Sequence, residues 1–365
     1  MRLTTLFGTR PETIKFAPLI KEGREQGHDV KVVFTGQHRE MAIPLLEFFG
    51  IQPDIDLNVM RPNQDLTALS GHMLRILNEN PLLRETDALM VQGDTTSAYI
   101  GAYWAFLNRI PVIHLEAGLR TNNIHSPFPE EANRQLISRL AEIHLAPTED
   151  AMLSLQGEGI VKNVHVIGNT GLDALRTVSE KLHDGHFPEK IRAFLGSNQL
   201  LLVTGHRREN FGSGMKQIAQ ALKKISQELP EIKIVYPVHL NPNVKDIMME
   251  ELKNLPNILL TEPLDYLPFV ALMKRASVIL TDSGGIQEEA PTLRIPVIVM
   301  RESTERAEGV KSGFCKLVGT DPQKICDEVK SALTHGCQGK GDNPYGDGFS
   351  SKKAWRILTH YKAAK

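Results

Sequence analysis

Short apolar runs alternate with longer amphipathic segments from one end of this chain to the other, and this alternation constrains the fold most strongly. A short run rich in Val, Ile and Leu is typical of a strand buried in a parallel sheet, and the segments between the runs have the length of crossover helices. In the first half, the expected strands are Leu3–Phe7, Val30–Thr35, Ala88–Gln92, Val112–Leu115 and Val164–Ile167, and the expected helices are 13–26, 44–49, 66–79 and 96–107. The pattern predicts an α/β fold.

A polar stretch at residues 181–198 interrupts the alternation, which then restarts. A length of 365 residues also exceeds what one hydrophobic core usually serves, so we expect two domains. We place the first domain at residues 1–169 and the second at 170–349, and we expect a C-terminal helix within 350–365, at about Ser350–Tyr361, to pack back on the first domain. The expected strands of the second domain are Leu200–Thr204, Ile232–Pro237, Ile258–Leu260, Val278–Thr281 and Val297–Val299.

The composition argues against several classes of protein. The 42 Lys and Arg residues nearly balance the 43 Asp and Glu residues, so the chain carries no overall charge suited to nucleic acid or to an anionic membrane. It has no leader-like segment and no run of about 18 apolar residues. Its cysteines, Cys315, Cys326 and Cys337, form no CxxC pair, which fits neither a disulfide framework nor a zinc site. These features predict a cytoplasmic protein.

Unusual polar clusters begin where the apolar strands end. Open parallel sheets bind ligands outside the carboxyl ends of their strands, so these clusters mark the expected site. Two such domains facing each other would form one inter-domain cleft, where we expect the ligand to bind. The clusters are Gly8–Glu12, Gly36–Arg39, Gln92–Thr96, Glu116–Arg120, Gly205–Asn210, His239–Pro242 and Asp282–Glu289.

The second domain offers groups that suit a phosphorylated ligand. Its best phosphate candidate is the turn Asp282–Gly285, with Ser283, Gly284 and Gly285, because a Gly-rich strand-to-helix turn exposes backbone N–H groups at a helix N-terminus. Glu289 would suit a ribose diol, and Arg306 could complete the anion site. An ordinary turn with solvated glutamates stays the alternative. His206 ends a strand within an Arg-rich loop, where an imidazolium could bind a diphosphate oxygen or assist its departure.

The first domain contributes mainly carboxylates. Asp94 and Glu116 each end a strand, whereas Glu130 and Glu131 begin a helix. Helix capping accounts well for one of the helical pair and poorly for Glu116. Carboxylates in one domain and basic groups in the other suit a reaction that moves a proton while a phosphorylated leaving group is held. Arg10 and Lys15 flank the first helix and fit an anion there, with a solvated helix face as the alternative reading.

Cofactor motifs are absent from the sequence. It has no GxGxxG, GxxxxGK[ST], HExxH, GxSxG or EF-hand pattern. We therefore expect no bound nicotinamide and no protein metal site, although a diphosphate could bring magnesium with it.

Taken together, eight motifs resemble those of the bacterial non-hydrolysing UDP-N-acetylglucosamine 2-epimerases. The resemblance runs from residue 1 to about residue 348, in the order and spacing of that family. The motifs are Phe7–Glu12, Gly36–Glu40, Gly93–Thr96, Glu116–Arg120, Pro129–Arg134, Gly205–Glu209, Tyr236–Pro242 and Thr281–Pro291.

The resemblance implies a GT-B fold of two Rossmann-like domains, a homodimer and no added cofactor. It also implies reversible conversion of UDP-N-acetylglucosamine into UDP-N-acetylmannosamine, by elimination of UDP to 2-acetamidoglucal and re-addition. Carried over by position, Asp94, Glu116 and Glu130 resemble the catalytic carboxylates of the family. The residues that resemble its UDP contacts are Arg10, Lys15, His206, Ser283, Gly285, Glu289 and Arg306.

Regulation and exact chemistry are less constrained by these motifs. Gln37, Arg207 and His239 resemble a second, regulatory UDP-N-acetylglucosamine site, but Glu40 and Asn63 stand where regulated members often carry glutamine and arginine. We therefore expect weak activation or none. A hydrolysing 2-epimerase that releases N-acetylmannosamine and a 2-epimerase of a UDP-diacetamido uronic acid stay as alternatives. A GT-B glycosyltransferase and a non-catalytic UDP-sugar sensor are more distant readings.

Overall fold

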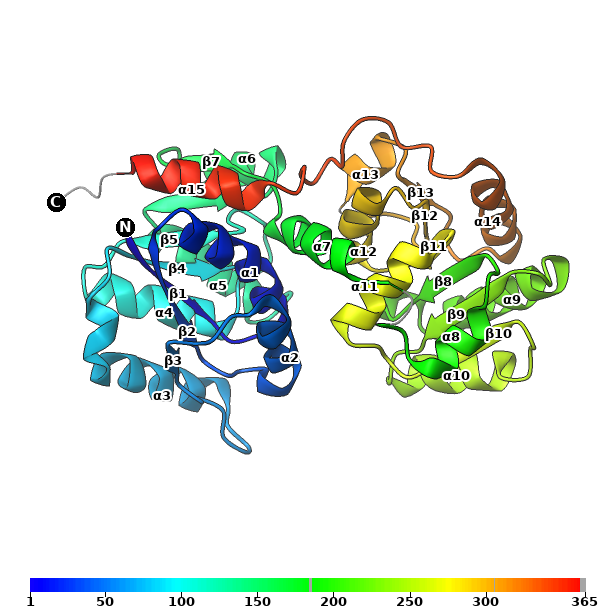
Figure 1. The fold of residues 1–365 in the computed structure, drawn as a ribbon, viewed down its shortest axis with the longest axis horizontal. Helices are drawn as coiled ribbons and strands as arrows, with labels where there is room; N and C mark the ends of the chain where they lie inside the picture. The colour runs from blue at the N-terminus through cyan, green and yellow to red at the C-terminus, as the bar shows by residue number, and fades with distance from the viewer. Residues whose placement is uncertain (184–185, 305, 362–365) are drawn as a thin grey trace. The chain divides into compact units, whose positions relative to one another are not determined.

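The computed structural model describes residues 1–183, 186–304 and 306–361, and it divides into two compact units. Unit 1 runs from Met1 to Ala174 and includes the C-terminal segment from Gly348, whereas unit 2 runs from Leu175 to Asp347. Each unit is an α/β layer structure built on one parallel sheet (Figure 1). Residues 362–365, which belong to the segment expected to return to the first domain, lie outside the described residues.

The sheet of unit 1 contains seven strands in the described residues, in the order β3-β2-β1-β4-β5-β6-β7. The strands are β1 Arg2–Phe7, β2 Asp29–Phe34, β3 Ile55–Asp56, β4 Ala88–Gln92, β5 Val112–Leu115, β6 Ile143–Ala146 and β7 Val164–Val166. The helices are α1 Arg10–Glu25, α2 Arg39–Phe49, α3 Leu66–Glu79, α4 Thr96–Leu107, α5 Glu130–Leu140, α6 Glu149–Gly157, α7 Thr170–Lys181, which continues into unit 2, and α15 Ser350–His360, with a 3-10 turn η1 at Pro81–Arg84.

Helices cover both faces of this sheet. One buried cluster includes Phe16 and Leu19 of α1 and Trp355 of α15, and the other includes Met73 of α3 and Trp104 of α4. The α15 helix packs beside α1 (Figure 1), where the Trp355 indole N–H donates to the carbonyl of Leu19 at 2.8 Å. Residue 23 must be glycine, because a Cβ there would lie 2.1 Å from the indole ring.

The sheet of unit 2 has six strands among the residues described, in the order β10-β9-β8-β11-β12-β13. The strands are β8 Leu200–Thr204, β9 Lys233–Pro237, β10 Ile258–Thr261, β11 Val278–Thr281, β12 Val297–Val299 and β13 Cys315–Leu317. The helices are α8 Glu189–Leu195, α9 Ser213–Glu228, α10 Pro242–Leu252, α11 Tyr266–Arg275, α12 Gly284–Glu289, α13 Ala307–Lys311 and α14 Pro322–His335, with 3-10 turns η3 at Arg208–Asn210 and η4 at Ala290–Leu293.

The structure corrects several expected elements. Three strands, β3, β6 and β13, were not predicted from the sequence, and α1 and α2 begin earlier than expected, at Arg10 and Arg39 instead of 13 and 44. The early start of α1 has a physical cause. Thr9 and Glu12 form a capping box, and Pro11 lies in the first turn, where its missing N–H costs nothing.

Both units share the feature that decides where ligands bind. In unit 1 the strand order reverses between β1 and β4, and in unit 2 it reverses between β8 and β11. The chain leaves these two neighbouring strands in opposite directions, which opens a crevice at their carboxyl ends. The loops after β1, β4, β8 and β11 therefore carry several of the candidate site residues, among them Arg10, Asp94, His206 and Ser283.

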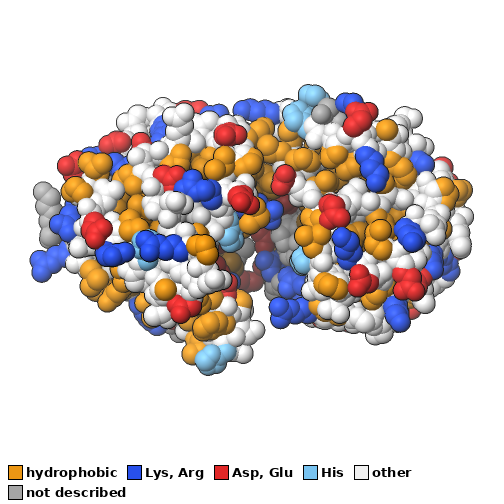
Figure 2. Space-filling view, turned by 90° about the horizontal axis from the view of Figure 1, so that it is seen from below, with side chains coloured by type: hydrophobic (Ala, Val, Ile, Leu, Met, Phe, Trp, Pro, Cys, Tyr) orange, Lys and Arg blue, Asp and Glu red, His pale blue; other side chains and the backbone are white. Residues whose placement is uncertain are grey.

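Surface charge and helix length add two facts. Acidic and basic side chains are interspersed over the face of each unit drawn in Figure 2, in keeping with a net charge of -1. Of the helices formed by the described residues, none is both long enough and apolar enough to span a bilayer.

Candidate functional site

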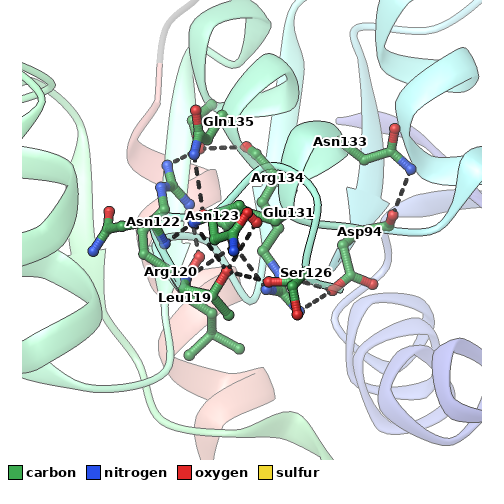
Figure 3. Close-up of polar contacts among 12 residues, drawn as sticks. Asp94, Leu119, Arg120, Asn122, Asn123, Ser126, Glu131, Asn133, Arg134 and Gln135 are labelled. Carbon is green, nitrogen blue, oxygen red and sulfur yellow. Dashed lines mark hydrogen bonds and ion pairs between the residues drawn. The ribbon is translucent and has the colours of Figure 1, made fainter. Parts of the chain in front are cut away.

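In unit 1 the candidate site is built on Asp94, which follows β4 in a turn made possible by the positive φ of Gly93, +66°. The Asp94 carboxylate forms an ion pair with Arg134 of α5 at 2.6 Å, and its backbone carbonyl accepts from the Asn133 side chain at 2.8 Å (Figure 3). Burial raises the pKa of Asp94, and the positive charge of Arg134 opposes this rise. The site therefore holds a largely buried carboxylate whose pKa responds to the charge of Arg134 and, less strongly, to the charges of Glu116 and Lys15.

The adjacent glutamates Glu130 and Glu131 face different surroundings. The Glu131 side chain is fully buried, binds Arg134 at 2.9 Å and accepts the backbone N–H groups of Thr121 and Asn122 (Figure 3). Burial alone would raise the pKa of Glu131, but the surrounding donors outweigh it and hold the pKa below its ordinary value. Glu131 thus anchors a loop. Glu130 begins α5 and is only partly buried, so its carboxylate stays accessible.

Glu116 lies directly after β5 in a left-handed backbone conformation, with φ of 61°. A non-glycine residue in this region is strained, and such strain is concentrated at functional positions. One oxygen of Glu116 contacts the Lys15 ammonium group and the other contacts the Gln92 amide. The structure therefore brings Lys15, expected as a UDP contact, next to a candidate catalytic carboxylate. Arg10 begins α1, directly after the turn that follows β1.

In unit 2 the candidate site is organised by Asp282, which follows β11 and is fully buried. Its carboxylate accepts the backbone N–H groups of His206, at 2.9 and 3.1 Å, and of Arg207, at 2.9 Å. The two loops at the strand reversal are thus joined by one side chain. Sequence reasoning included Asp282 in the expected phosphate turn but did not assign it this joining role, although an Asp directly after a strand was a visible signal.

The His206 ring lies over the same carboxylate and beside a second imidazole. Its Nδ1 is 3.5 Å from Asp282, and the ring stacks on His239 with centroids 5.5 Å apart. Burial lowers the pKa of His206 below its ordinary value, Asp282 acts to raise it, and His239 and Arg207 lower it further. Protonation of His206 would therefore be favoured by an additional negative group, such as a phosphate.

The Gly-rich turn lies against a guanidinium group. Ser283 precedes α12, and a Cβ on Gly284 would come within 2.9 Å of Arg306 Cζ, so only glycine lets Arg306 lie this close. Arg306 also forms an ion pair with Glu288 at 2.9 Å. Gly285 is in the first turn of α12, and Glu289, its last residue, is half-buried.

The residues expected at a regulatory site are divided between the two units. In unit 1, Gln37 accepts a hydrogen bond from Ser97 at 2.9 Å, and both Glu40 and Asn63 are exposed. In unit 2, Arg207 follows His206, and His239 stacks on its ring. No cluster of three or more His, Cys, Asp or Glu side chains within 1–183, 186–304 and 306–361 could hold a metal ion.

Comparison with known proteins agrees with this architecture. A solved UDP-GlcNAc 2-epimerase from Neisseria meningitidis, bound to UDP-GlcNAc, matches with a TM-score of 0.83 and 41% identity over 99% of this chain and 100% of that one. The UDP-GlcNAc 2-epimerase from Methanocaldococcus jannaschii matches with a TM-score of 0.86 and 34% identity, again over 99% and 100%. The expected GT-B fold with two Rossmann-like domains is confirmed.

Sequence comparison leads to the same group of proteins. The UDP-N-acetylglucosamine 2-epimerase of Yersinia pestis is 46% identical over 376 residues, which cover 99% of both chains. The family model described as UDP-N-acetylglucosamine 2-epimerase matches residues 21–359. This chain therefore belongs to the UDP-N-acetylglucosamine 2-epimerase family.

Proposed function

We propose that this protein interconverts UDP-N-acetylglucosamine and UDP-N-acetylmannosamine without releasing the free sugar. The observation that carries the proposal is the placement of Asp94 and Glu116 after the neighbouring strands β4 and β5, each beside a cation. Two carboxylates at one sheet edge suit proton removal and proton return at a single carbon.

The reaction proceeds by elimination because the C2 hydrogen of the sugar is not next to a carbonyl, so its direct removal would leave an unstabilised carbanion. A carboxylate takes the C2 proton while the C1–O bond breaks and UDP leaves with the bonding electrons. The product pair is 2-acetamidoglucal and UDP. A proton then returns to the other face of C2 as UDP re-forms the bond at C1. Asp94, Glu116 and Glu130 are the proposed acid–base groups.

The proposed diphosphate contacts in unit 2 are the turn N–H groups of Ser283, Gly284 and Gly285, the guanidinium of Arg306 and the imidazole of His206, whose protonation a bound phosphate would favour. Glu289 is the proposed ribose contact. Arg10 and Lys15 are proposed to contribute from unit 1. The reaction balances in protons and electrons without a redox cofactor, so no added cofactor is needed.

The proposal is tested by incubating the protein with UDP-N-acetylglucosamine in heavy water and following the products by NMR. We expect UDP-N-acetylmannosamine with deuterium at C2. Free N-acetylmannosamine would indicate a hydrolysing enzyme, sugar transfer to an acceptor would indicate a glycosyltransferase, and unchanged substrate would indicate a binding protein. A UDP-diacetamido uronic acid is offered in a parallel incubation. If only this compound is converted, the protein is a 2-epimerase of that sugar and not of UDP-N-acetylglucosamine. Complete retention of the C2 hydrogen at full turnover would exclude elimination.

The assembly that we propose is a homodimer formed through α4. This helix is apolar on all sides, yet Phe106 and Leu107 at its end are more than half exposed, and Tyr99 and Tyr103 stack on its surface. We infer the interface from this grouping of Phe106 and Leu107 beside the tyrosine pair on one helix. Phe106→Glu should give a monomer by light scattering, whereas Leu153→Glu, at an equally exposed position on α6, should not. A dimer that persists in Phe106→Glu would exclude this face.

Two further proposals concern regulation and location. We propose that activation by UDP-N-acetylglucosamine is weak, because Asn63 has no guanidinium to bind a second diphosphate and Glu40 adds a negative charge. Strongly sigmoidal kinetics would contradict this. The proposed location is the cytoplasm, in keeping with three cysteines that form no disulfide among the described residues.

A further inference from the structure

Glu12 is an ionisable side chain that the proposed reaction does not use. It lies in the first turn of α1 and is 1% exposed, so it cannot reach a substrate. Burying a carboxylate is costly unless several donors bind it. Burial raises the pKa of Glu12 above its ordinary value, and the donors around it oppose that rise. Such a residue needs a structural or functional reason.

The contacts of Glu12 join two loops. One carboxylate oxygen accepts the backbone N–H groups of Gly8, at 3.1 Å, and Thr9, at 2.8 Å, together with the Thr9 hydroxyl at 2.7 Å. The other oxygen accepts the Thr95 hydroxyl at 2.7 Å. Thr95 in turn caps α4, because its hydroxyl oxygen accepts the N–H of Ala98 at 3.0 Å. One carboxylate thus fastens the N-termini of α1 and α4 to each other.

These two helix ends lie where ligand-binding residues are expected, because β1 and β4 are the strands at which the order of the sheet reverses. Arg10 directly follows Thr9, and Asp94 directly precedes Thr95. The four donors hold the carboxylate from both sides, so neither turn can move without stretching a hydrogen bond.

We propose that Glu12 is a positioning residue. It holds the turn that precedes Arg10 and the turn that contains Asp94 at the relative position that the reaction needs. This inference rests on the proposed function, in which Asp94 moves the C2 proton. Glu12 itself acts through the two turns and touches neither the substrate nor the reacting atoms.

The first pair of variants separates the effect of side-chain length from the effect of side-chain charge. Glu12→Asp keeps the charge but is one methylene shorter, so it cannot bind both turns. Glu12→Gln keeps the length and one acceptor oxygen, and its amide can donate to Thr95. We expect kcat to fall about ten- to hundredfold in Glu12→Asp and less in Glu12→Gln, because misplacement by a fraction of an ångström has effects of this size. Enzyme assays below the melting temperature of each variant compare folded proteins.

The second variant pair separates the two turns. Thr95→Val removes the hydrogen bond to Glu12 and also the cap that Thr95 gives α4, and it leaves the three donors of Gly8 and Thr9 in place. We expect kcat and the rate of C2 proton exchange to fall about tenfold, while the Kd for UDP stays within about twofold. Thr95→Ser restores the hydroxyl and should recover most of the lost turnover. Serine also restores the cap of α4, so the deciding result is the separation of kcat from UDP affinity, which would not follow from a loss of stability alone.

A matched control addresses stability. Asp321 caps α14 of unit 2 through a carboxylate that accepts the N–H of Lys324 at 2.7 Å. Asp321→Ala should lower the melting temperature without changing kcat. Asp94→Asn is measured alongside to test the underlying assignment.

The outcomes are distinguishable. A wild-type kcat in both Glu12→Asp and Thr95→Val, with Asp94→Asn inactive, overturns the positioning role and leaves the proposed function intact. If only Thr95→Val is soluble, the separation of its kcat from its UDP affinity decides the question. A wild-type kcat in Asp94→Asn overturns the role of Asp94, and this inference with it.

Discussion

Arg134 is the side chain whose loss should have the clearest combined effect on stability and activity. It binds Asp94 at 2.6 Å and Glu131 at 2.9 Å, and its own side chain is only 16% exposed. In Arg134→Met the apolar stem is kept and the charge is lost. Two carboxylates, one fully buried and one 25% exposed, are then left without the cation that they share.

The size of the effect follows from the geometry. Two unit charges about 4 Å apart attract each other by about 4 kcal/mol at the effective dielectric constant of a partly buried site. Removing one partner of a buried pair typically costs about 3–5 kcal/mol. Because Asp94 keeps some contact with water, we expect the free energy of unfolding to fall by about 3 kcal/mol. Arg139→Met on the same helix is the control, since its ion pair with Glu158 is long, at 3.9 Å, and Arg139 itself is 58% exposed, so the pair should contribute less than about 1 kcal/mol.

Activity should respond through protonation. Burial raises the pKa of Asp94 and Arg134 lowers it, so Arg134→Met should raise this pKa further. A tenfold change in the acid dissociation constant corresponds to about 1.4 kcal/mol. If Asp94 acts as a carboxylate, the acidic limb of kcat against pH moves to higher pH. The pKa of Glu131 is shifted in the opposite direction from that of Asp94, and this shift affects stability. Its pKa is held below the ordinary value, so its stabilising effect is lost as pH falls, and the variant should approach the wild type in acid.

The assays are kcat across a pH series and urea unfolding at each pH. An acidic limb that does not move, together with a stability loss no larger than that of Arg139→Met, would refute the view that Arg134 controls the charge of Asp94.

Three further variants test other parts of the molecule. His206→Asn removes a charge-assisted hydrogen bond worth about 1.5–3 kcal/mol, so 2-acetamidoglucal and UDP should escape about ten- to hundredfold more often per epimerisation; an unchanged ratio in a product assay would assign His206 to proton transfer instead. Asp282→Asn should lower the pKa of His206 further, because Asp282 acts to raise it, and NMR titration of the ring would show a rise or no change if this is wrong. Trp355→Ala should lower the free energy of unfolding by about 3–5 kcal/mol, measured by urea unfolding, and a loss below about 1 kcal/mol would mean that α15 adds little to the core.

The sequence predicted the buried strands well and the short or interrupted ones poorly. β4, β5, β8, β11 and β12 have the expected bounds because they are buried and mainly apolar. β6 was missed although its pattern, with a buried His144, matches that of the neighbouring β5, in which His114 is buried. β3 has two residues and β13 has three, with an exposed Lys316 in its centre, so neither shows a periodicity of its own.

The site divides along a similar line. Positions such as Asp94 after β4 followed from the pattern of strand ends, but partners distant in sequence did not. Arg134 lies 40 residues from Asp94, and Lys15 lies 101 residues from Glu116. Glu130 and Glu131 are chemically identical neighbours. The rotation of α5 about its own axis, relative to the sheet, decides which of the two is buried. The local sequence does not determine this rotation, because it depends on how the helix packs against the sheet.

The two units solve one problem of this architecture with different residues. Where the strand order reverses, the loops after the two neighbouring strands diverge, so no regular backbone hydrogen bonding joins these loops. In unit 1 the joining carboxylate is Glu12, from the helix after the first strand, and it binds across to Thr95 after the fourth. In unit 2 it is Asp282, after the fourth strand, and it binds back to the N–H groups of His206 and Arg207 after the first. An ionised carboxylate suits this position better than an amide because both of its oxygens only accept, so it can gather several backbone and hydroxyl donors at once. A fully buried carboxylate at the point where the strand order reverses is therefore explained by the need to hold two loops together. This explanation does not depend on a direct role in the reaction.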